Sequence, residues 1–200
     1  HNNTESMASV LKQQGYNTIG MHPYYGSGWA RNKAYPLMGF DKFLDIDSFD
    51  DATTKYLRRY VSDESSFNKV IDLYNQNKKQ SDNPLFLFNV TIQNHCGYDT
   101  VYDNFPENVD FQFDSLYPYT KQYLSLIQES DKQIKNLVDY FSKVDEPTII
   151  VLFGDHMPYI ENSFYNHLTR GSSKTTSEIE LDQHTVPFFI WANYDIDTSD

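Results

Sequence analysis

Histidine and aspartate side chains follow three apolar segments of this chain, at the point where each segment ends. They are His22, His95 and the adjacent pair Asp155 and His156. If the segments are strands of an open α/β sheet, these side chains stand at the carboxyl ends, where such sheets bind their ligands. Random placement of 6 histidines in 200 residues would rarely give this arrangement. We therefore take these positions as the candidate site.

The sharpest of these signals is Gly154-Asp155-His156. A glycine after a buried strand allows a tight turn, so that two adjacent side chains can converge on one ion. A carboxylate oxygen and an imidazole nitrogen then supply half of a site suited to zinc or manganese. The spacing is equally compatible with Asp155 as the cap of a turn and His156 as a packed surface residue.

Trp29 and Arg31 follow His22 and add side chains suited to phosphate. A guanidinium can grip a phosphate in bidentate fashion, and an indole supplies a flat apolar wall beside it. The alternatives are core packing for Trp29 and a solvated first helical turn for Arg31. A cation at a helix start opposes the macrodipole, which favours a functional reason for Arg31.

His95 lies where the chain turns into Cys96 and Gly97. Its ring could donate to a phosphoryl oxygen or to a leaving alkoxide, although a structural histidine is the more common role of such a residue. Cys96 lacks a supporting base pattern, so a cysteine nucleophile is not expected. His167 and His184 carry less weight, and the sequence assigns them no role.

The elements that must position these residues alternate between helix and strand. The patterns predict helices over 4–14, 31–38, 62–79 and 117–141, and strands over 16–21, 40–46, 85–92, 148–153 and 186–192. The last two strands are continuous apolar runs, typical of strands covered on both faces. This order predicts an α/β fold with a mostly parallel sheet and helices on both faces. The length and composition predict a single domain over 1–200.

The composition excludes several partners. A net charge of -12 disfavours nucleic acid and anionic membrane surfaces, so a phosphate-bearing substrate must be held by local features. The longest apolar runs are far shorter than the roughly 20 residues that a membrane-spanning helix needs. The single cysteine cannot form an internal disulfide. The chain opens directly on the approach to a helix, and we expect it to be part of a longer protein.

Six stretches occur together in an order that matches a known family. They are Gly15 to His22, Trp29 to Arg31 with Gly39 to Phe43, Val90 to His95, Phe153 to His156, and Val186 to Ile190. Together they extend over nearly the whole chain and resemble lipoteichoic acid synthases, the phosphoglycerol transferases of the sulfatase and alkaline phosphatase superfamily. The resemblance implies an incomplete alkaline phosphatase-like fold, with this chain as the C-terminal portion of the extracellular catalytic domain.

The resemblance also implies a role for each candidate residue. It implies that His22, Trp29 and Arg31 line a pocket for glycerol phosphate. It implies that His95 contacts the substrate or the transition state. It also implies that Asp155 and His156 are ligands of one divalent cation. The cation it implies is manganese, with magnesium or zinc as alternatives.

In this family a threonine nucleophile and a glutamate metal ligand lie upstream of the first helix expected here. None of Thr4, Thr18, Thr53 and Thr54 stands in the nucleophile's context, so no nucleophile is assigned. A membrane anchor would also lie upstream. Because two ligands hold an ion weakly, we expect the isolated chain to be inactive and to bind metal loosely or not at all.

The function implied by the resemblance is transfer of phosphoglycerol through a covalent threonine intermediate. The donor would be a phosphatidylglycerol-type lipid and the acceptor a glycerol phosphate polymer or a glycolipid, at the extracellular face of the bacterial cytoplasmic membrane. The alternatives are a phosphoethanolamine transferase, a phosphodiesterase or a sulfatase of the same superfamily. A noncatalytic module that binds glycerol phosphate polymers is an alternative of another class.

Overall fold

The computed structural model describes residues 5–196 of the chain. The chain divides into two compact units, each with its own set of contacts. The first unit comprises His1–Asn94 with Tyr102–Phe105, and the second comprises His95–Val101 with Pro106–Asp200.

A three-stranded parallel sheet forms the centre of the first unit. Its strands are β2 (Lys42–Leu44), β1 (Asn17–Met21) and β5 (Leu85–Asn89), in the spatial order β2-β1-β5. Ile19 in the central strand pairs with Lys42 on one side and with Leu87 on the other. All three strands therefore end at the same edge of the sheet, as the sequence predicted for the strands that precede His22 and His95.

Three helices flank this sheet, namely α1 (Met7–Gln13), α2 (Arg31–Leu37) and α3 (Asp63–Gln80). Serine side chains cap the starts of α1 and α3. The Ser6 hydroxyl accepts a hydrogen bond from the Ser9 amide at the start of α1, and Ser62 accepts one from Ser65 at the start of α3. Thr4, where the sequence predicted the first helix to begin, lies outside the described residues.

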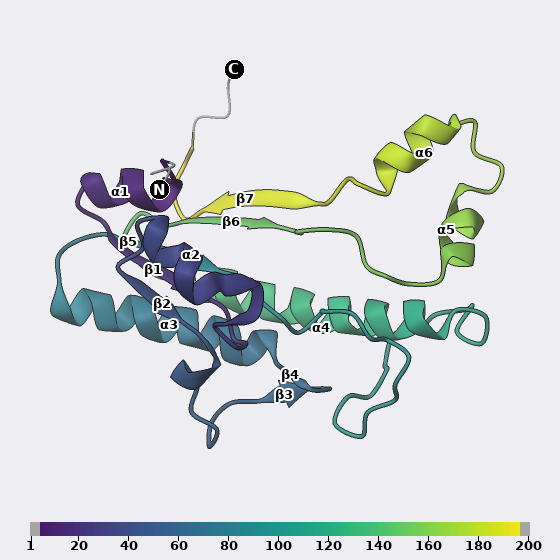
Figure 1. Ribbon diagram of the computed structural model, residues 1–200, viewed down its shortest axis with the longest axis horizontal. Helices are drawn as coiled ribbons and strands as arrows, with labels where there is room; N and C mark the ends of the chain where they lie inside the picture. The colour runs from purple at the N-terminus through teal and green to yellow at the C-terminus, as the bar shows by residue number, and fades with distance from the viewer. Residues whose placement is uncertain (1–4, 197–200) are drawn as a thin grey trace. The chain divides into compact units, whose positions relative to one another are not determined.

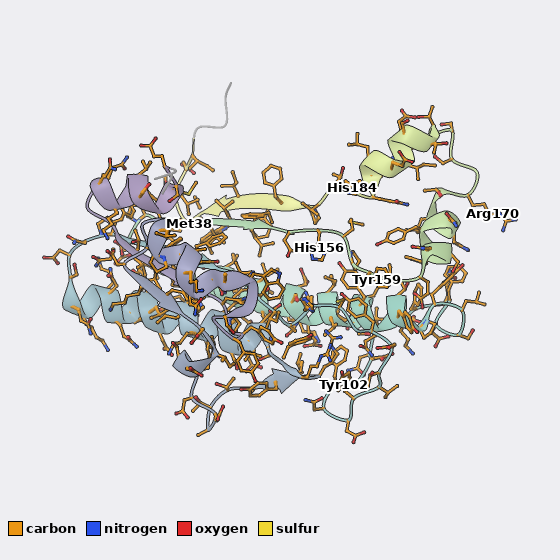
Figure 2. All side chains as sticks on the ribbon, in the orientation of Figure 1. Met38, Tyr102, His156, Tyr159, Arg170 and His184 are labelled. Atoms are coloured by element: carbon orange, nitrogen blue, oxygen red, sulfur yellow. The ribbon has the colours of Figure 1, made fainter. Side chains whose placement is uncertain are left out.

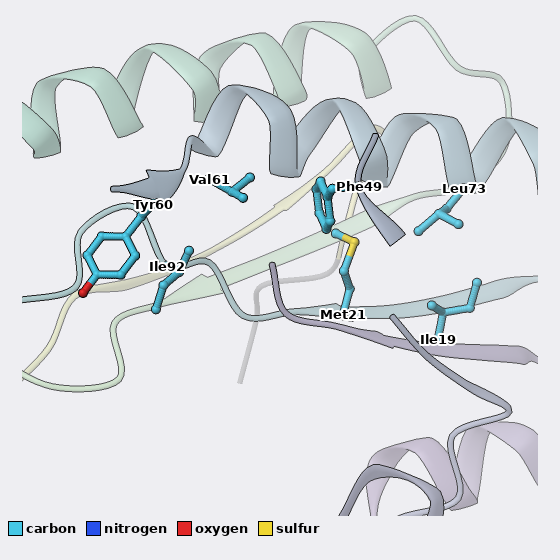
Figure 3. Packing of buried hydrophobic residues seen from close by; sticks show 7 residues of the cluster. All are labelled: Ile19, Met21, Phe49, Tyr60, Val61, Leu73 and Ile92. Carbon is cyan, nitrogen blue, oxygen red and sulfur yellow. The ribbon is translucent and has the colours of Figure 1, made fainter. Parts of the chain in front are cut away.

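The helices cover both faces of the parallel sheet. On the α3 side, Ile19 and Met21 of β1 pack with Leu73 of α3, and Figure 3 shows these residues within the buried cluster. On the other side, Ala8 of α1 and Tyr35 of α2 belong to a second cluster with phenylalanines from the strands and loops. The predicted α/β fold with a parallel sheet flanked by helices is confirmed.

Tyr35 can pack onto the sheet because the residue beneath it is Gly20. A Cβ atom at Gly20 would lie 2.1 Å from the Tyr35 ring. The ring centroid of Tyr35 lies 4.5 Å from that of Phe43 and 5.1 Å from that of Phe40. Helix α2 is thus anchored by one aromatic side chain that fills the space left by a glycine.

Short elements complete the first unit. The 3-10 helices η1 (Gly28–Ala30) and η2 (Ile46–Ser48) flank α2 and β2 in the sequence. The strands β3 (Tyr56–Leu57) and β4 (Tyr60–Val61) form a small antiparallel pair before α3. The sequence analysis did not predict these four elements, which are too short to show a periodic pattern.

The second unit contains the long helix α4 (Pro118–Phe141) and an antiparallel pair of strands, β6 (Ile149–Phe153) and β7 (Phe188–Ala192). The connection between these strands contains α5 (Asn162–Thr169) and α6 (Thr176–Asp182) (Figure 1). Neither of these two helices was predicted. Helix α6 begins inside a polar stretch, where Thr175 and Glu178 form a capping box.

The prediction that the β6 and β7 runs are covered on both faces is wrong. In β6, Ile149, Val151 and Phe153 are 52%, 54% and 56% exposed, and in β7, Phe188 and Ile190 are 70% and 54% exposed. Among the described residues, these two strands form a sheet of their own, so only their other face is partly buried.

In the part of the chain that the structure describes, no helix combines the length and the apolar character that crossing a bilayer requires.

Candidate functional site

The candidate residues divide between the two units. The first unit holds His22, Trp29 and Arg31, and the second holds His95, Asp155 and His156. We describe the two groups separately.

His22 lies directly after β1 and is almost fully buried, with 1% of its surface exposed. Its backbone amide donates to the Leu44 carbonyl, and its Nδ1 lies 2.7 Å from the Val90 carbonyl oxygen. Because a carbonyl can only accept, Nδ1 must carry a proton, and the neutral ring then has its lone pair on Nε2. The Val90 carbonyl thus orients the imidazole, while the Leu44 carbonyl holds the backbone of the same residue.

The loop that follows His22 places two aromatic rings next to its imidazole. The His22 ring centroid lies 5.8 Å from that of Trp29 and 6.1 Å from that of Tyr24. Trp29 itself is 61% exposed, so the alternative that it packs into the core is wrong. An exposed indole beside a buried histidine forms an apolar wall that a ligand can contact.

The backbone of this loop is strained at Trp29 and Ala30. Both residues have φ of 53°, in the left-handed region that residues with a Cβ rarely adopt. Such a conformation costs on the order of 1–3 kcal/mol per residue and persists only where surrounding contacts impose it. Here the amides of Gly28, Ala30 and Asn32 donate to carbonyls earlier in the loop. The strain places the indole next to Arg31.

Arg31 is the first residue of α2, and its guanidinium carbon lies 4.5 Å from the centroid of the Trp29 ring. Its Nη1 atom is buried and has no hydrogen-bond partner among the described residues. A buried donor without a partner carries an energetic penalty that an anion would remove. The alternative of a fully solvated arginine is wrong, because Arg31 is half-buried.

Tyr35 was missed by the sequence analysis and lies one helical turn after Arg31. Burial raises the pKa of the Tyr35 phenol, while the charge and hydrogen bonding of the Arg31 guanidinium act in the opposite direction. The phenol is therefore close enough to Arg31 to influence where the guanidinium points. The i, i+4 spacing on a predicted helix was the signal that could have identified it.

His95 is half-buried at the beginning of the second unit. Its Nδ1 lies 3.7 Å from Cys96 Sγ. Strand β5 ends at Asn89, earlier than predicted, so His95 follows an irregular segment and not the strand itself. Gln93 in that segment is fully buried and accepts a hydrogen bond from the Asp63 amide at the start of α3. The chain is thus held firmly just before it reaches His95.

Asp155 and His156 lie just beyond β6, and Figure 2 shows His156 on the connection after that strand. The Nδ1 atom of His156 lies 2.8 Å from the Met157 carbonyl oxygen and must donate to it. The lone pair of the neutral ring is then on Nε2, 3.6 Å from Oδ2 of Asp155. Both side chains are largely exposed, at 72% for His156 and 79% for Asp155.

This geometry fits a shared metal ion. Two donors about 2.1 Å from an ion and about 109° apart are separated by roughly 3.4 Å, close to the spacing of these two atoms. Metal-binding histidines commonly donate their other nitrogen to a carbonyl, as His156 does here. Within residues 5–196, no cluster contains three or more histidine, cysteine, aspartate or glutamate side chains suited to a metal. An ion held by this pair would therefore need further donors from elsewhere.

Gly154 has a different role from the one predicted. Its φ is outside the left-handed region, so it does not make a turn that only glycine could adopt. Instead, a Cβ at Gly154 would lie 3.2 Å from the Cβ of Val186, and the Gly154 amide donates to the Pro187 carbonyl. The glycine allows the end of β6 to approach the segment that leads into β7.

The two remaining histidines, His167 and His184, differ in their surroundings. His167 on α5 lies 4.7 Å from the Phe113 ring, and its Nδ1 is 3.4 Å from the Tyr117 hydroxyl. His184 is exposed just before β7 (Figure 2). A cavity of about 230 Å³ between α3 and β2 is lined by residues such as Lys42 and Lys69, and none of the candidate residues lines it.

Comparisons with known proteins identify the family to which the chain is related. The family whose model matches the chain is described as Sulfatase, and the match covers residues 1–199. The capsular polysaccharide biosynthesis protein RkpI of Rhizobium meliloti (strain 1021) is 31% identical over 152 residues, which are 76% of this chain and 26% of that protein. Lipoteichoic acid synthase 1 of Bacillus subtilis (strain 168) is 25% identical over 175 residues, which are 80% of this chain and 25% of that protein.

A solved structure shows the same fold. It is the Streptococcus pyogenes phosphoglycerol transferase GacH in complex with sn-glycerol-1-phosphate, with a TM-score of 0.67 at 24% identity. The alignment covers 90% of this chain and 44% of that chain. The chain spans about a quarter of the length of the two curated relatives.

Proposed function

Because the chain belongs to the sulfatase family, we propose that it is part of a metal-dependent enzyme that transfers phosphoglycerol to a cell-surface polymer or glycolipid. The observation that carries the proposal is the Arg31 guanidinium, which stacks on Trp29 and has a buried nitrogen without a partner among the described residues. This group offers a charged donor for a phosphate and a flat wall for the glycerol beside it.

The proposed donor is a phosphatidylglycerol-type lipid, and the proposed acceptor is a glycerol phosphate polymer or a glycolipid. Two comparisons support this choice: a relative named lipoteichoic acid synthase, and a similar fold that was solved with sn-glycerol-1-phosphate. We place the reaction at the extracellular face of the bacterial cytoplasmic membrane, and we assign residues 1–200 to one catalytic domain.

Oδ2 of Asp155 and Nε2 of His156 are the proposed metal donors in this chain. Manganese is the proposed cation, with magnesium or zinc as alternatives, and when bound it would offset negative charge on the phosphoryl group. The hydrogen bond from Nδ1 to the Met157 carbonyl selects the tautomer of the neutral His156 ring in which Nε2 carries the lone pair that a metal needs.

The other candidate residues have roles in binding and proton transfer. Arg31 pairs with a phosphate oxygen, and Trp29 excludes water from one side of the glycerol. The imidazole of His95 transfers a proton to the leaving oxygen or from the entering one. The nucleophile is a threonine hydroxyl from another part of the full-length protein. It attacks phosphorus, diacylglycerol leaves, and an acceptor hydroxyl then displaces the threonine.

Substitution of Arg31→Lys in the full-length protein tests the phosphate site. Lysine keeps the charge but lacks the planar fork and stacks poorly on an indole. We expect kcat/KM for transfer of labelled glycerol phosphate to fall about tenfold or more, which corresponds to about 1.4 kcal/mol of transition-state stabilisation. Arg170→Lys, at an exposed position on the second unit, is the control and should leave the rate unchanged. Equal rates in the two variants would exclude Arg31 from the site.

A second candidate function is a noncatalytic module that binds glycerol phosphate polymers. It is favoured by one observation: Arg31, Trp29 and His22 come together in the first unit, which does not contain the metal pair.

Substitution of His156→Ala in the full-length protein separates these two functions. If the protein is the proposed enzyme, loss of one metal donor should lower turnover by about 100-fold or more, while glycerol phosphate binding changes little. The exposed His184 gives the matched control, His184→Ala. Normal turnover in His156→Ala would reject the metal assignment. A full-length protein that binds glycerol phosphate without any turnover would support the module.

A further inference from the structure

The connection from β6 to α5 carries Asp155 and His156 and forms neither helix nor strand. His156 and Tyr159 mark this connection in Figure 2. Because both proposed metal donors are largely exposed, contacts of their own side chains do little to fix them. The hydrogen bond from the Gly154 amide to the Pro187 carbonyl holds the beginning of the connection. The place of the two donors therefore also depends on what holds its other end.

Glu161, the last residue before α5, holds that end. Its Oε1 atom accepts a hydrogen bond from the Tyr119 amide at 2.8 Å. Its Oε2 atom accepts one from the Thr120 amide at 3.0 Å and one from the Thr120 hydroxyl at 2.7 Å. These donors lie in the first turn of α4, where a negative charge is favourable. Three hydrogen bonds to a charged acceptor thus tie the connection to α4.

Local capping does not account for this arrangement. Tyr117, at the N-cap position of α4, makes no side-chain cap hydrogen bond, so the first amides of α4 need an acceptor from elsewhere. Glu161 is at the N-cap position of α5, yet its side chain does not cap α5. Thr120 is fully buried and Ile160 is 7% exposed, so this end of the connection is well packed. The carboxylate therefore serves a helix that is distant in the sequence.

Helix α4 also holds the loop that begins at His95. The buried Gln122 side chain donates from Nε2 to the Thr100 carbonyl at 2.8 Å. The ring centroid of Tyr123 lies 5.6 Å from that of Tyr98, which is buried. These residues all belong to the second unit. One end of α4 thus contacts both segments that carry the candidate residues of this unit.

We propose that Glu161 is a positioning residue, which sets the place of Asp155 and His156 relative to His95 by tying their connection to α4. The inference rests on the proposed function, in which this pair holds a divalent cation. Glu161 acts through the connection and not as a metal ligand, because both of its carboxylate oxygens are already engaged. Loss of groups that orient metal ligands typically weakens metal binding by about 10- to 100-fold.

Glu161→Gln in the full-length protein tests this proposal. Glutamine keeps the shape of the side chain, but its amide nitrogen cannot accept the hydrogen bonds that one carboxylate oxygen accepts. We expect the Kd for Mn²⁺, measured by calorimetry on metal-free protein, to rise about tenfold. We also expect kcat at saturating Mn²⁺ to stay about tenfold below that of the wild type, because the donors are displaced relative to His95.

Glu178→Gln is the matched control. The Glu178 carboxylate accepts hydrogen bonds from the Thr175 amide at 2.7 Å and the Thr175 hydroxyl at 2.8 Å, the same chemistry at the start of α6. Its loss should leave the Kd for Mn²⁺ and kcat unchanged, although the free energy of unfolding can fall in both variants. An effect on metal binding that is confined to Glu161→Gln therefore supports positioning over a general loss of stability.

His156→Ala separates this inference from the proposed metal site. If His156→Ala weakens Mn²⁺ binding while Glu161→Gln binds Mn²⁺ as the control does, the positioning role is overturned and the metal site stands. If His156→Ala binds Mn²⁺ as the wild type does, the metal site and the inference both fail. If Glu161→Gln does not fold, Thr120→Val removes only the hydroxyl hydrogen bond and should raise the Kd about threefold. An unchanged Kd in that variant would overturn the proposal.

Discussion

At the scale of single residues, the position of Arg31 depends on two aromatic neighbours, Trp29 and Tyr35. Trp29 reaches the guanidinium because the backbone at Trp29 and Ala30 is held in the left-handed region. Tyr35 approaches it from the next helical turn and is fixed by close packing against Gly20. The orientation of one arginine therefore rests on a strained loop, an aromatic contact and a glycine in the sheet.

Tyr35→Phe tests this positioning. The ring that packs against Gly20 is kept, and only the hydroxyl beside Arg31 is lost, so the fold should be preserved. We expect KM for the glycerol phosphate donor to rise about threefold to tenfold with little change in kcat, because ground-state and transition-state binding weaken together. Steady-state kinetics of the full-length protein measure this split. The 81% exposed Tyr159 gives the control, Tyr159→Phe. A fall in kcat alone would contradict the positioning role.

At the scale of elements, Asp41 connects the beginning of β2 to α1 and β1. Its Oδ2 accepts hydrogen bonds from the Thr18 amide at 3.0 Å and the Thr18 hydroxyl at 2.9 Å, and its Oδ1 pairs with Lys12. The hydrogen bond from Lys12 and those from Thr18 lower the pKa of the Asp41 carboxyl, although partial burial opposes them. Three elements are thus joined at one carboxylate.

This connection makes stability depend on pH. Because the folded-state pKa of Asp41 is lowered, its contribution is present above the unfolded pKa, near 3.9, and is lost as the pH falls through the folded value. Asp41→Asn should therefore lower the free energy of unfolding by about 1 kcal/mol at pH 7, with the difference shrinking below about pH 4. Urea unfolding of the protein at several pH values measures it. Asp47→Asn, at an exposed position, is the control and should have the same free energy of unfolding as the wild type. If the loss of unfolding free energy in Asp41→Asn does not change with pH, the Asp41 carboxylate does not cause the pH dependence.

At the scale of the whole molecule, the two units differ in how deeply their elements are buried. Four of the five residues of β1 are buried at the centre of the first unit. Helices α5 and α6 of the second unit contain no buried residue. Elements that bury little surface can open at low free-energy cost without unfolding the rest.

Hydrogen exchange should reveal this difference. We expect the amides of β1 to exchange at least 100-fold more slowly than those of α5 and α6, because opening β1 requires disruption of a buried core while opening the helices does not. Mass spectrometry of peptides from the full-length protein at neutral pH measures both regions in one experiment. Helix α3, which carries buried residues, is an internal reference for a protected helix. Equal protection of β1 and α6 would contradict this view.

The sequence by itself determined the order of the main elements and the identity of the candidate residues. The period of the apolar positions fixed α1, α2, α3 and α4, because one face of each must be buried. The start of α3 was predicted at Ser62, which caps it, whereas α1 begins at Met7 and not at the predicted residue 4. The apolar run before His22 correctly placed this histidine at the end of a parallel strand, whereas His95 follows an irregular segment and His156 follows an antiparallel strand.

Only the tertiary structure decided what surrounds these residues. Contacts between residues far apart in the sequence, such as Tyr35 over Gly20, leave no periodic signal. The same holds for the hydrogen bond that fixes the ring of His22 through the distant Val90 carbonyl. An apolar run in β6 looks the same whether one face or both are covered, because periodicity records side-chain type and not the presence of a neighbour. Exposure, ring orientation and close approach depend on packing in space, and packing is set by the whole fold.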